Sequence, residues 1–287
     1  MGSVIRRRAR SLVNRVRGRL ERDAWARAYA RGYRRAVRLD VLSGAVESRS
    51  VPVVMCLWNR PDRIDTILRQ LDSQDGDVGV RLMLWNNKPS NDARYREAIA
   101  SYARTGSLHS IEYRVSRQNL GGVARFFVAR QLVREGSNDP FIMLDDDQDI
   151  SSSFVGDLRA AYEPRTYAGW WAFMNHGSYV ERSAVADGEP ASYVGTGGSI
   201  CDPALVMSPG FFEELPHPFA FVEDLWASAR ALKLGWRVRK VETTISFVQE
   251  ELNQFNNILQ LKVDFYEELA DAVPLLRGAD APGSLPA

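Results

Sequence analysis

Short apolar runs alternate with helical patterns over residues 51–150, and this alternation restricts the fold more than any other feature of the chain. Residues 51–57 are apolar throughout, which is typical of a parallel strand covered on both faces. Pro61 suits the first turn of a following helix. Strand–helix repeats of this kind predict a parallel sheet flanked by helices. The same pattern predicts strands at 80–85, 111–115 and 141–144 and helices at about 93–103 and 123–135.

The most informative local signal is segment 141–149, where four apolar residues are followed by three consecutive aspartates. An extended backbone places Asp145 and Asp147 on the same side. Paired carboxylates at the carboxyl end of a strand suit a hard divalent cation that also takes phosphate oxygens as ligands. A calcium loop is excluded because Ile150 and Gly156 occupy the positions of its glycine and closing glutamate. A metal–phosphate site and a solvated acidic turn both remain open.

The composition describes a globular protein in a reducing compartment. A chain of 287 residues with 45% hydrophobic content can form one large domain or two smaller ones. Its two cysteines, Cys56 and Cys201, form neither a disulfide framework nor a metal cluster. No apolar run approaches the roughly 20 residues of a membrane span, and no secretory signal is recognisable. We therefore expect a cytoplasmic location.

The positive charge is concentrated at the N-terminus. Residues 1–40 contain 13 arginines and three acids, a net charge of +10, whereas the remainder carries −9. Apolar residues recur through 4–39 at helical spacing, which predicts a basic amphipathic helix. Such a helix suits an anionic membrane surface, so that the protein would be peripheral on the inner face, but its apolar stripe equally suits packing against the rest of the chain or a second subunit. Nucleic acid is disfavoured because the remainder is acidic.

The second half of the chain has a different character. Residues 151–220 are rich in aromatic residues, glycine and proline and are expected to form short strands and loops. A helix is predicted at 223–234, ending at Gly235. Residues 43–50 are expected to form a linker, 236–241 a strand, 252–272 a helix, and the residues from 274 onward a frayed tail.

Four polar segments fall at strand ends: 57–60, 85–87, 119–122 and 144–147. In a parallel sheet these ends meet, so one ligand could contact all four. Gly121 and Gly122 would let backbone N–H groups approach a phosphate or sugar, and Asn86 could pair with a base edge. Taken singly, each of these residues is equally explained by a turn.

Over about residues 51–240 the chain resembles the nucleotide-sugar glycosyltransferases of the GT-A fold, most closely the family 2-like group. The resemblance implies an α/β fold with a Rossmann-like mixed sheet flanked by helices. It also implies transfer of a sugar from a nucleotide-sugar, with a UDP-sugar the expected donor, Mn²⁺ or Mg²⁺ the cofactor, and a glycan or lipid-linked acceptor. It rests on Asn59-Arg60-Pro61-Asp62, Asn119-Leu120-Gly121-Gly122, Leu144-Asp145-Asp146-Asp147 as a DXD motif, Gly195-Thr196-Gly197-Gly198-Ser199, and Val222-Glu223-Asp224-Leu225-Trp226 followed by Arg230-Ala231-Leu232-Lys233-Leu234-Gly235.

The resemblance also implies site roles. Asp147 would bind the metal together with Asp145, which would contact the ribose or the metal, and Asp224 would be the general base beside Glu223. Two departures bear on these roles: Asn86 stands where the family often has aspartate, and all three histidines precede the base-bearing helix, which leaves the expected histidine ligand absent or displaced. The expected nucleotide-binding residues are Leu57, Asn59, Arg60, Asn86, Asn119, Gly121, Gly122, Asp145 and Asp146, and the expected acceptor residues are Trp170, Trp171, Gly197, Gly198 and Trp226.

The chemistry of these residue types fits the implied reaction. A divalent ion neutralises the charge on a leaving diphosphate, and a carboxylate on the opposite face takes the proton of the acceptor hydroxyl. Glu223 and Asp224 also open a helix, where acids are ordinarily explained by capping and the helix dipole. Each tryptophan suits either a sugar-stacking platform or the core. If Trp170 and Trp171 lie in a strand, they face opposite ways and at most one lines the site.

Several alternatives stay open. The anomeric outcome is expected to be inverting, but Trp85-Asn86-Asn87 and the aspartate run also resemble the retaining exostosin-like transferases. A nucleotidyltransferase is disfavoured because no glycine-rich phosphate loop with a basic residue follows the first strand. The expected organisation is a basic helical extension at 1–48, a nucleotide-sugar-binding half at 51–150, an acceptor-binding and catalytic half at 151–250, and a C-terminal helix and flexible tail at 251–287.

Overall fold

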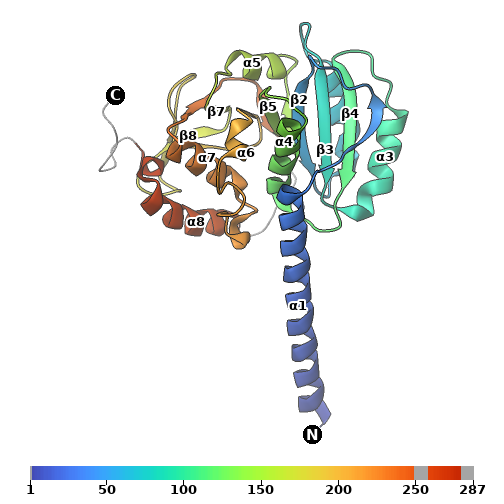
Figure 1. Ribbon diagram of the computed structural model, residues 1–287, viewed down its shortest axis with the longest axis vertical. Coiled ribbons are helices and arrows are strands. Elements are labelled where there is room, and N and C mark those ends of the chain that lie inside the picture. Colours follow the sequence, from blue (N-terminus) through green and yellow to red (C-terminus); the bar gives the residue numbers. More distant parts are fainter. Residues whose placement is uncertain (1, 249–257, 279–287) are drawn as a thin grey trace.

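The computed structural model describes residues 2–248 and 258–278, with side chains from residue 18 onward. Its body is a mixed sheet with helices on both faces, from which α1 (Gly2–Arg34) projects (Figure 1). None of the helices in these ranges is both long and apolar enough to cross a membrane.

The main sheet has eight strands in the order β1-β4-β3-β2-β5-β11-β7-β12. Strands β4, β3, β2 and β5 run parallel to one another, β11 is antiparallel to β5 and β7, and β12 is parallel to β7. The predicted mixed α/β sheet is thereby confirmed. The strands are β1 (Asp40–Gly44), β2 (Val51–Leu57), β3 (Val80–Asn86), β4 (Leu108–Val115), β5 (Phe141–Asp145), β7 (Thr166–Gly169), β11 (Ser199–Cys201) and β12 (Arg237–Lys240).

Two apolar clusters cover the two faces of the sheet, and alternate residues of β2 point into each. Val53 and Met55 face one cluster, with the buried side of α2, whereas Val54 and Cys56 face the other, with α4 and α7. This alternation is why β2 is apolar at every position. The helices are α2 (Ile64–Asp72), α3 (Asp92–Ser101), α4 (Ala124–Arg134), α5 (Phe154–Ala160), α6 (Ala204–Met207), α7 (Glu223–Lys233) and α8 (Ile258–Ala272).

Smaller elements complete the second half. One small sheet joins β10, β8 and β9, and a second pairs β13 with β6, the strand that follows the aspartate run. The expectation of short strands and loops over 151–220 therefore holds, except that it omitted helices α5 and α6. These strands are β6 (Gln148–Ile150), β8 (Ala172–Asn175), β9 (Arg182–Ala184), β10 (Tyr193–Val194) and β13 (Ile245–Phe247), and the 3₁₀ turns are η1 (Pro61–Arg63), η2 (Pro89–Asn91), η3 (Gly121–Val123), η4 (His217–Phe219) and η5 (Pro274–Arg277).

The N-terminal segment is more closely integrated than expected. Tyr29 and Tyr33 of α1 are buried against α4, and the Tyr29 hydroxyl donates to the Phe212 carbonyl at 2.8 Å. Strand β1 then pairs with β4, which corrects the prediction of a linker for residues 43 and 44. The side chains before residue 18, on which much of the amphipathic prediction depends, lie outside the described residues.

The C-terminal prediction is correct in part. Helix α8 occupies 258–272 of the expected 252–272, and residues 249–257 lie outside the description. Residues 274–277 form η5 with Leu276 fully buried, so the chain is not frayed there. Residues 279–287 of the expected tail are not described.

Candidate active site

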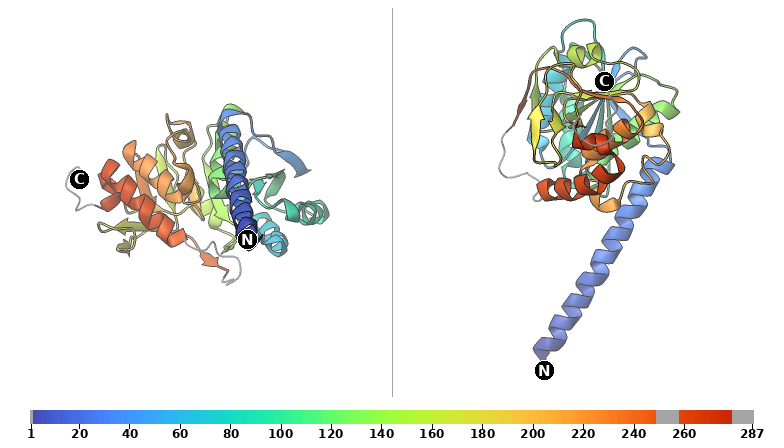
Figure 2. Two further views of the ribbon diagram at one scale, coloured as in Figure 1. Left: turned by 90° about the horizontal axis from the view of Figure 1, so that it is seen from below. Right: turned by 90° about the vertical axis from the view of Figure 1, so that its left-hand side faces the viewer.

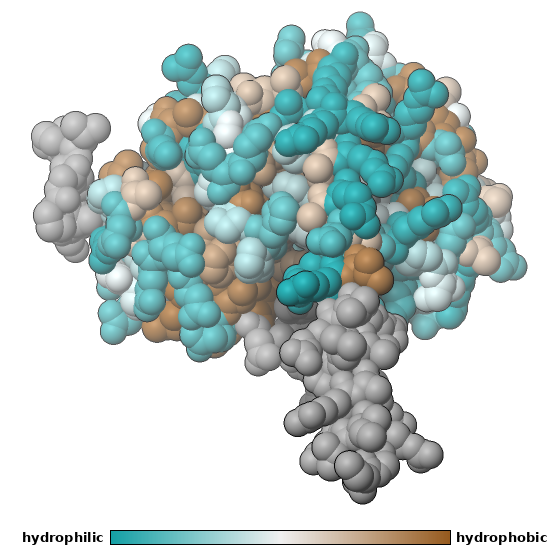
Figure 3. All heavy atoms as spheres, turned by 60° about the horizontal axis from the view of Figure 1, so that its bottom comes forward, coloured by the Kyte–Doolittle hydropathy of each residue, from teal (hydrophilic) through white to brown (hydrophobic). Residues whose placement is uncertain are grey.

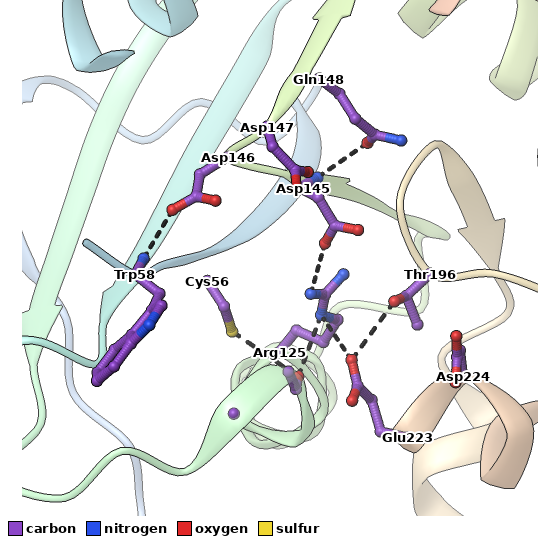
Figure 4. Close-up of polar contacts among 12 residues, drawn as sticks. Cys56, Trp58, Arg125, Asp145, Asp146, Asp147, Gln148, Thr196, Glu223 and Asp224 are labelled. Atoms are coloured by element: carbon purple, nitrogen blue, oxygen red, sulfur yellow. Dashed lines mark hydrogen bonds and ion pairs between the residues drawn. The ribbon is translucent and has the colours of Figure 1, made fainter. Parts of the chain in front are cut away.

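The aspartate run turns the chain between β5 and β6, and its central residue is structural. Asp146 is buried and accepts a hydrogen bond from the Trp58 backbone N–H at 2.7 Å (Figure 4). It accepts a second one from Arg60 Nη1 at 2.8 Å. Burial raises the pKa of Asp146 to about 7, against the opposing effect of these two donors. Both carboxylate oxygens are thus engaged in fastening the turn after β2 to the turn after β5. Asp146 and Arg60 hold the site together and do not line its cavity.

Asp145 points from the end of β5 towards Arg125 on the first turn of α4. Arg125 Nη2 donates to Asp145 Oδ1 at 2.7 Å, and its Nε lies 3.7 Å from Glu223 Oε1. Burial opposes the charge of Arg125, but Asp145, Cys56 and Glu223 raise its pKa, so it remains a cation. The buried Nη1 of Arg125 has no hydrogen-bond partner in the described part of the chain, and a buried donor of this kind calls for an acceptor.

Arg125 was missed by sequence reasoning. The available signal was an arginine three residues after Gly122, on the first turn of the helix that precedes the aspartate strand.

Asp147 is the second aspartate that could bind a metal, with Asp145, whose side chain is 35% exposed, as its neighbour. Its side chain is 24% exposed, and Oδ2 lies 3.4 Å from Arg60 Nη2. Burial and the nearby charge of Asp145 raise the pKa of Asp147, as expected of acids that lack a full counter-charge. Among the residues described, no three His, Cys, Asp or Glu side chains form a group that could hold a metal. The carboxylates of Asp145 and Asp147 fit a hard divalent ion only if a ligand such as a diphosphate supplies most of the coordination of that ion.

Glu223 and Asp224 open α7 across the cavity from the aspartates. Glu223 is buried, lies 3.4 Å from Thr196 Oγ1, and has its pKa raised by burial to about 7. Helix α7 has Val222 at its N-cap position without a side-chain cap. Asp224 Oδ1 accepts a hydrogen bond within the first turn, from the Leu225 backbone N–H at 2.8 Å.

Asp224 is held in a buried ion pair. Its Oδ2 accepts from Lys262 Nζ at 2.6 Å and from the Tyr193 hydroxyl at 2.5 Å. Burial works against the ionised form, yet Lys262 and these hydrogen bonds lower the pKa of Asp224 overall. Lys262 comes from α8, and sequence reasoning gave no signal for it because the two residues are 38 positions apart.

A cavity of about 270 Å³ brings these groups together. All four predicted strand-end segments contribute to its wall, as do residues of α7 and α8. Figure 4 shows Trp58, Asp145, Glu223 and Asp224 from this wall. The cavity is lined by Cys56, Trp58, Asn87, Asn119, Gly121, Gly122, Arg125, Asp145, Thr196, Phe221, Glu223, Asp224, Ile258 and Lys262.

Two glycines permit the close approach of carboxylates to the backbone. A Cβ on Gly122 would overlap the Glu223 carboxylate, and a Cβ on Gly197 would overlap Asp145 Oδ2. Gly121 has a φ of +66° and Gly198 a φ of +77°, in the left-handed region that favours glycine. Gly198 also donates its N–H to the Met143 carbonyl at 2.9 Å, which ties the predicted acceptor loop to β5.

Asn86 does not reach the cavity, contrary to expectation. It is fully buried, its Nδ2 donates to the Tyr113 hydroxyl at 2.8 Å, and its Oδ1 accepts from the Lys88 backbone N–H at 2.7 Å. Asn87 lines the cavity instead and fastens the glycine loop, accepting from the Leu120 N–H and donating to the Gly121 carbonyl.

The turn after β2 presents a different residue from the three expected, of which Arg60 is bound to Asp146. Leu57 is fully buried in the core, and Asn59 is exposed with a φ of 55°. Trp58 between them lines the cavity, with Lys88 Nζ 4.8 Å from its ring centroid.

The predicted acceptor tryptophans separate into two groups. Trp170 and Trp171 lie in the turn between β7 and β8 with ring centroids 5.5 Å apart, and both rings contact the exposed Phe247. The prediction that they face opposite ways applied only to a strand, and it does not apply here because neither residue lies in one. Trp226 is buried in the core with its Nε1 donating to the Phe211 carbonyl at 2.7 Å, which corrects its assignment to the acceptor site.

The sequence matches no protein-family model and no curated protein. Solved structures share its fold. The mannosyltransferase PcManGT from Pyrobaculum calidifontis, in complex with GDP-Man and Mn²⁺, matches with a TM-score of 0.52 and 12% identity, over 91% of this chain and 73% of that one. S. aureus TarS 1–349 in complex with UDP-GlcNAc matches with a TM-score of 0.51 and 14% identity, over 81% of this chain and 67% of that one. GalNAc-T7 with UDP, GalNAc and Mn²⁺ matches with a TM-score of 0.51 and 10% identity, over 76% of this chain and 47% of that one. The expectation of a GT-A-type fold is confirmed, and the chain spans about half to three quarters of these proteins.

Proposed function

We propose that the protein is a metal-dependent glycosyltransferase that transfers a sugar from a nucleotide-sugar to an acceptor hydroxyl. The observation that carries this proposal is the arrangement around the cavity: Asp145 at the end of β5 and Asp224 on α7 line it together, and Arg125 contacts both Asp145 and Glu223. An anionic leaving group and a proton-accepting carboxylate on opposite sides of one cavity are what such a transfer requires.

The donor would occupy the side formed by the strand ends. The unpartnered Arg125 Nη1 and the glycine loop at 121–122 are suited to the diphosphate, and Trp58 and Asn87 to the nucleoside. Asp145 and Asp147 would hold Mn²⁺ or Mg²⁺, which when bound neutralises charge on the leaving diphosphate. Structural neighbours solved with UDP, GDP-Man and Mn²⁺ support a nucleotide-sugar donor, and a UDP-sugar is our first choice.

The acceptor would approach from the side of α7. Asp224 would take the proton of the acceptor hydroxyl in an inverting displacement, with Glu223 fixed against Arg125 and Thr196. Trp170, Trp171 and the exposed Phe247 offer aromatic faces suited to stacking on a glycan or lipid-linked acceptor. Within this proposal, 51–150 forms the donor half and 151–250 the acceptor half of a cytoplasmic enzyme, and the basic N-terminal helix would hold it at an anionic membrane surface.

Calorimetry with UDP and GDP, with and without Mn²⁺, tests the proposal on matched variants. Asp147→Asn should abolish the Mn²⁺-dependent part of binding, whereas Asp224→Asn should bind normally but lose turnover by about 10²–10⁴-fold, as expected when a general base is removed. Nucleotide binding by wild type that does not depend on Mn²⁺ would contradict the metal role. If Glu223→Gln loses turnover and Asp224→Asn does not, Glu223 is the base. The anomeric configuration of the product decides between inversion and retention.

A further inference from the structure

A second, larger cavity of about 530 Å³ lies between α1 and the chain that leaves β4. We call it the arginine groove. In Figure 3 hydrophilic side chains gather on the face of the body where α1 joins it. The groove is lined by Ala24, Arg27, Ala28, Arg31, Gly32, Arg35, Ala36, Val37, Trp85, Arg114, Val115, Ser116, Arg117, Gln118 and Leu120.

The helix side of the groove is built from a four-residue repeat. Ala24 and Ala28 present small side chains along one face of α1, and Arg27, Arg31 and Arg35 each precede a small residue (Ala28, Gly32 and Ala36) by one position. Residues four apart share a helix face and are about 6 Å apart along the axis. The three exposed guanidinium groups therefore follow one another along the rim.

Arg114 and Arg117 bring two more cations from the opposite wall. The Arg114 guanidinium lies 5.1 Å from the Trp85 ring centroid and donates through Nη1 to the Arg38 carbonyl at 3.0 Å. Its Nε is buried and has no hydrogen-bond partner within the described ranges. The carboxylate that interacts electrostatically with Arg114 is that of the exposed Asp40. Asp40 also forms an ion pair with Arg96, with Oδ2 3.7 Å from Nη2.

We propose that the arginine groove is a binding site for clustered phosphate groups. Five arginines line one cavity, and within the described residues none of the five forms an ion pair with a carboxylate closer than 4.0 Å. Guanidinium groups bind phosphate oxygens in a bidentate manner, and several cations held close together repel one another until an anion is bound. A phospholipid headgroup and a soluble polyphosphate present this chemistry equally.

The groove shares a wall with the candidate active site. Leu120 lines the groove, whereas its neighbours Asn119 and Gly121 line the cavity of the candidate active site. The Trp25 indole of α1 donates a hydrogen bond to the Asn119 carbonyl at 2.9 Å. The groove is nevertheless a separate site, and its proposal does not depend on the glycosyltransferase assignment.

The test uses inorganic tripolyphosphate as the probe, by calorimetry on the full chain at about 0.15 M ionic strength without divalent cations. The groove variant is Arg31→Gln/Arg35→Gln/Arg117→Gln, and the control, Arg22→Gln/Arg69→Gln/Arg94→Gln, changes the net charge equally at exposed positions outside the cavity. We expect the groove variant to weaken binding at least about tenfold and the control less than about twofold, since only the groove variant removes charge-assisted hydrogen bonds to the phosphate oxygens. Matching melting temperatures establish that both variants fold.

Co-sedimentation with phosphatidylcholine vesicles that contain phosphatidic acid distinguishes the two sources of phosphate. Vesicle binding by wild type and control, lost in the groove variant, identifies a headgroup site. Tripolyphosphate binding without vesicle binding identifies a soluble ligand. Equal weakening in the groove variant and the control, or no binding of either probe by wild type, overturns the proposal.

Discussion

At the scale of single residues, the Lys262–Asp224 pair sets the chemistry of the proposed base. A general base must be ionised and must also have enough proton affinity to accept a proton. The Lys262 ammonium keeps Asp224 ionised but lowers its affinity for a proton. Sequence reasoning selected Asp224 from its motif but not Lys262 or Tyr193, because a buried pair between distant elements leaves no local pattern.

We predict that Lys262→Met shifts the acidic limb of the pH profile of kcat/KM to higher pH. Burial raises the pKa of a carboxyl, and without Lys262 that effect on Asp224 loses its main opposition. Stability should also fall by about 3 kcal/mol at neutral pH, because one buried charge is left unpaired. This loss should shrink as the pH falls through the raised pKa, since protonation removes the charge.

Lys233→Met, at an exposed position on α7, is the matched control and should leave the pH profile unchanged. An acidic limb that stays in place in Lys262→Met would show that Asp224 does not control it.

At the scale of elements, the site depends on two close contacts at glycines: Gly122 of η3 lies against Glu223 of α7, and Gly197, in the loop between β10 and β11, lies against Asp145 of β5. We predict that Gly122→Ala lowers stability by about 1–3 kcal/mol, because its Cβ would overlap the Glu223 carboxylate and push α7 from the glycine loop. Donor affinity should fall with it. Gly156→Ala in α5 is the control, since its Cβ meets nothing within 4 Å, and the substitution should be neutral or slightly stabilising. Denaturant unfolding measures both, and equal effects would refute the packing argument.

Strands β2 and β1 illustrate which elements the local sequence pattern predicts and which it misses. Strand β2 was predicted to the residue because both of its faces are buried, so that every position is apolar. Strand β1 was missed because it is an edge strand with exposed and half-buried residues, and its sequence reads as a polar linker. Asn86 and Asn87 were likewise confused because only the turn geometry determines which amide faces the cavity.

At the scale of the whole molecule, the N-terminal segment is part of the body as well as a projection from it (Figure 2). We predict that a chain beginning at residue 51 is less stable by several kcal/mol. It lacks the buried side chains of Tyr29, Tyr33 and Val37, each worth about 1.5–3 kcal/mol, and also strand β1. A chain beginning at residue 18 should unfold at nearly the same denaturant concentration as the full chain. Equal stability of all three chains would show that α1 packs only weakly.

The thiol at the cavity wall has a consequence for the response of the protein to oxidants. Cys56 is 9% exposed with its Sγ 3.7 Å from the Gly122 carbonyl, and burial raises its pKa to about 12. Burial likewise raises the pKa of the fully buried Cys201. Since the thiolate is the form that reacts, we expect both thiols to have low reactivity at neutral pH. The candidate active site therefore has a cysteine in its wall that we expect to react only slowly with oxidants.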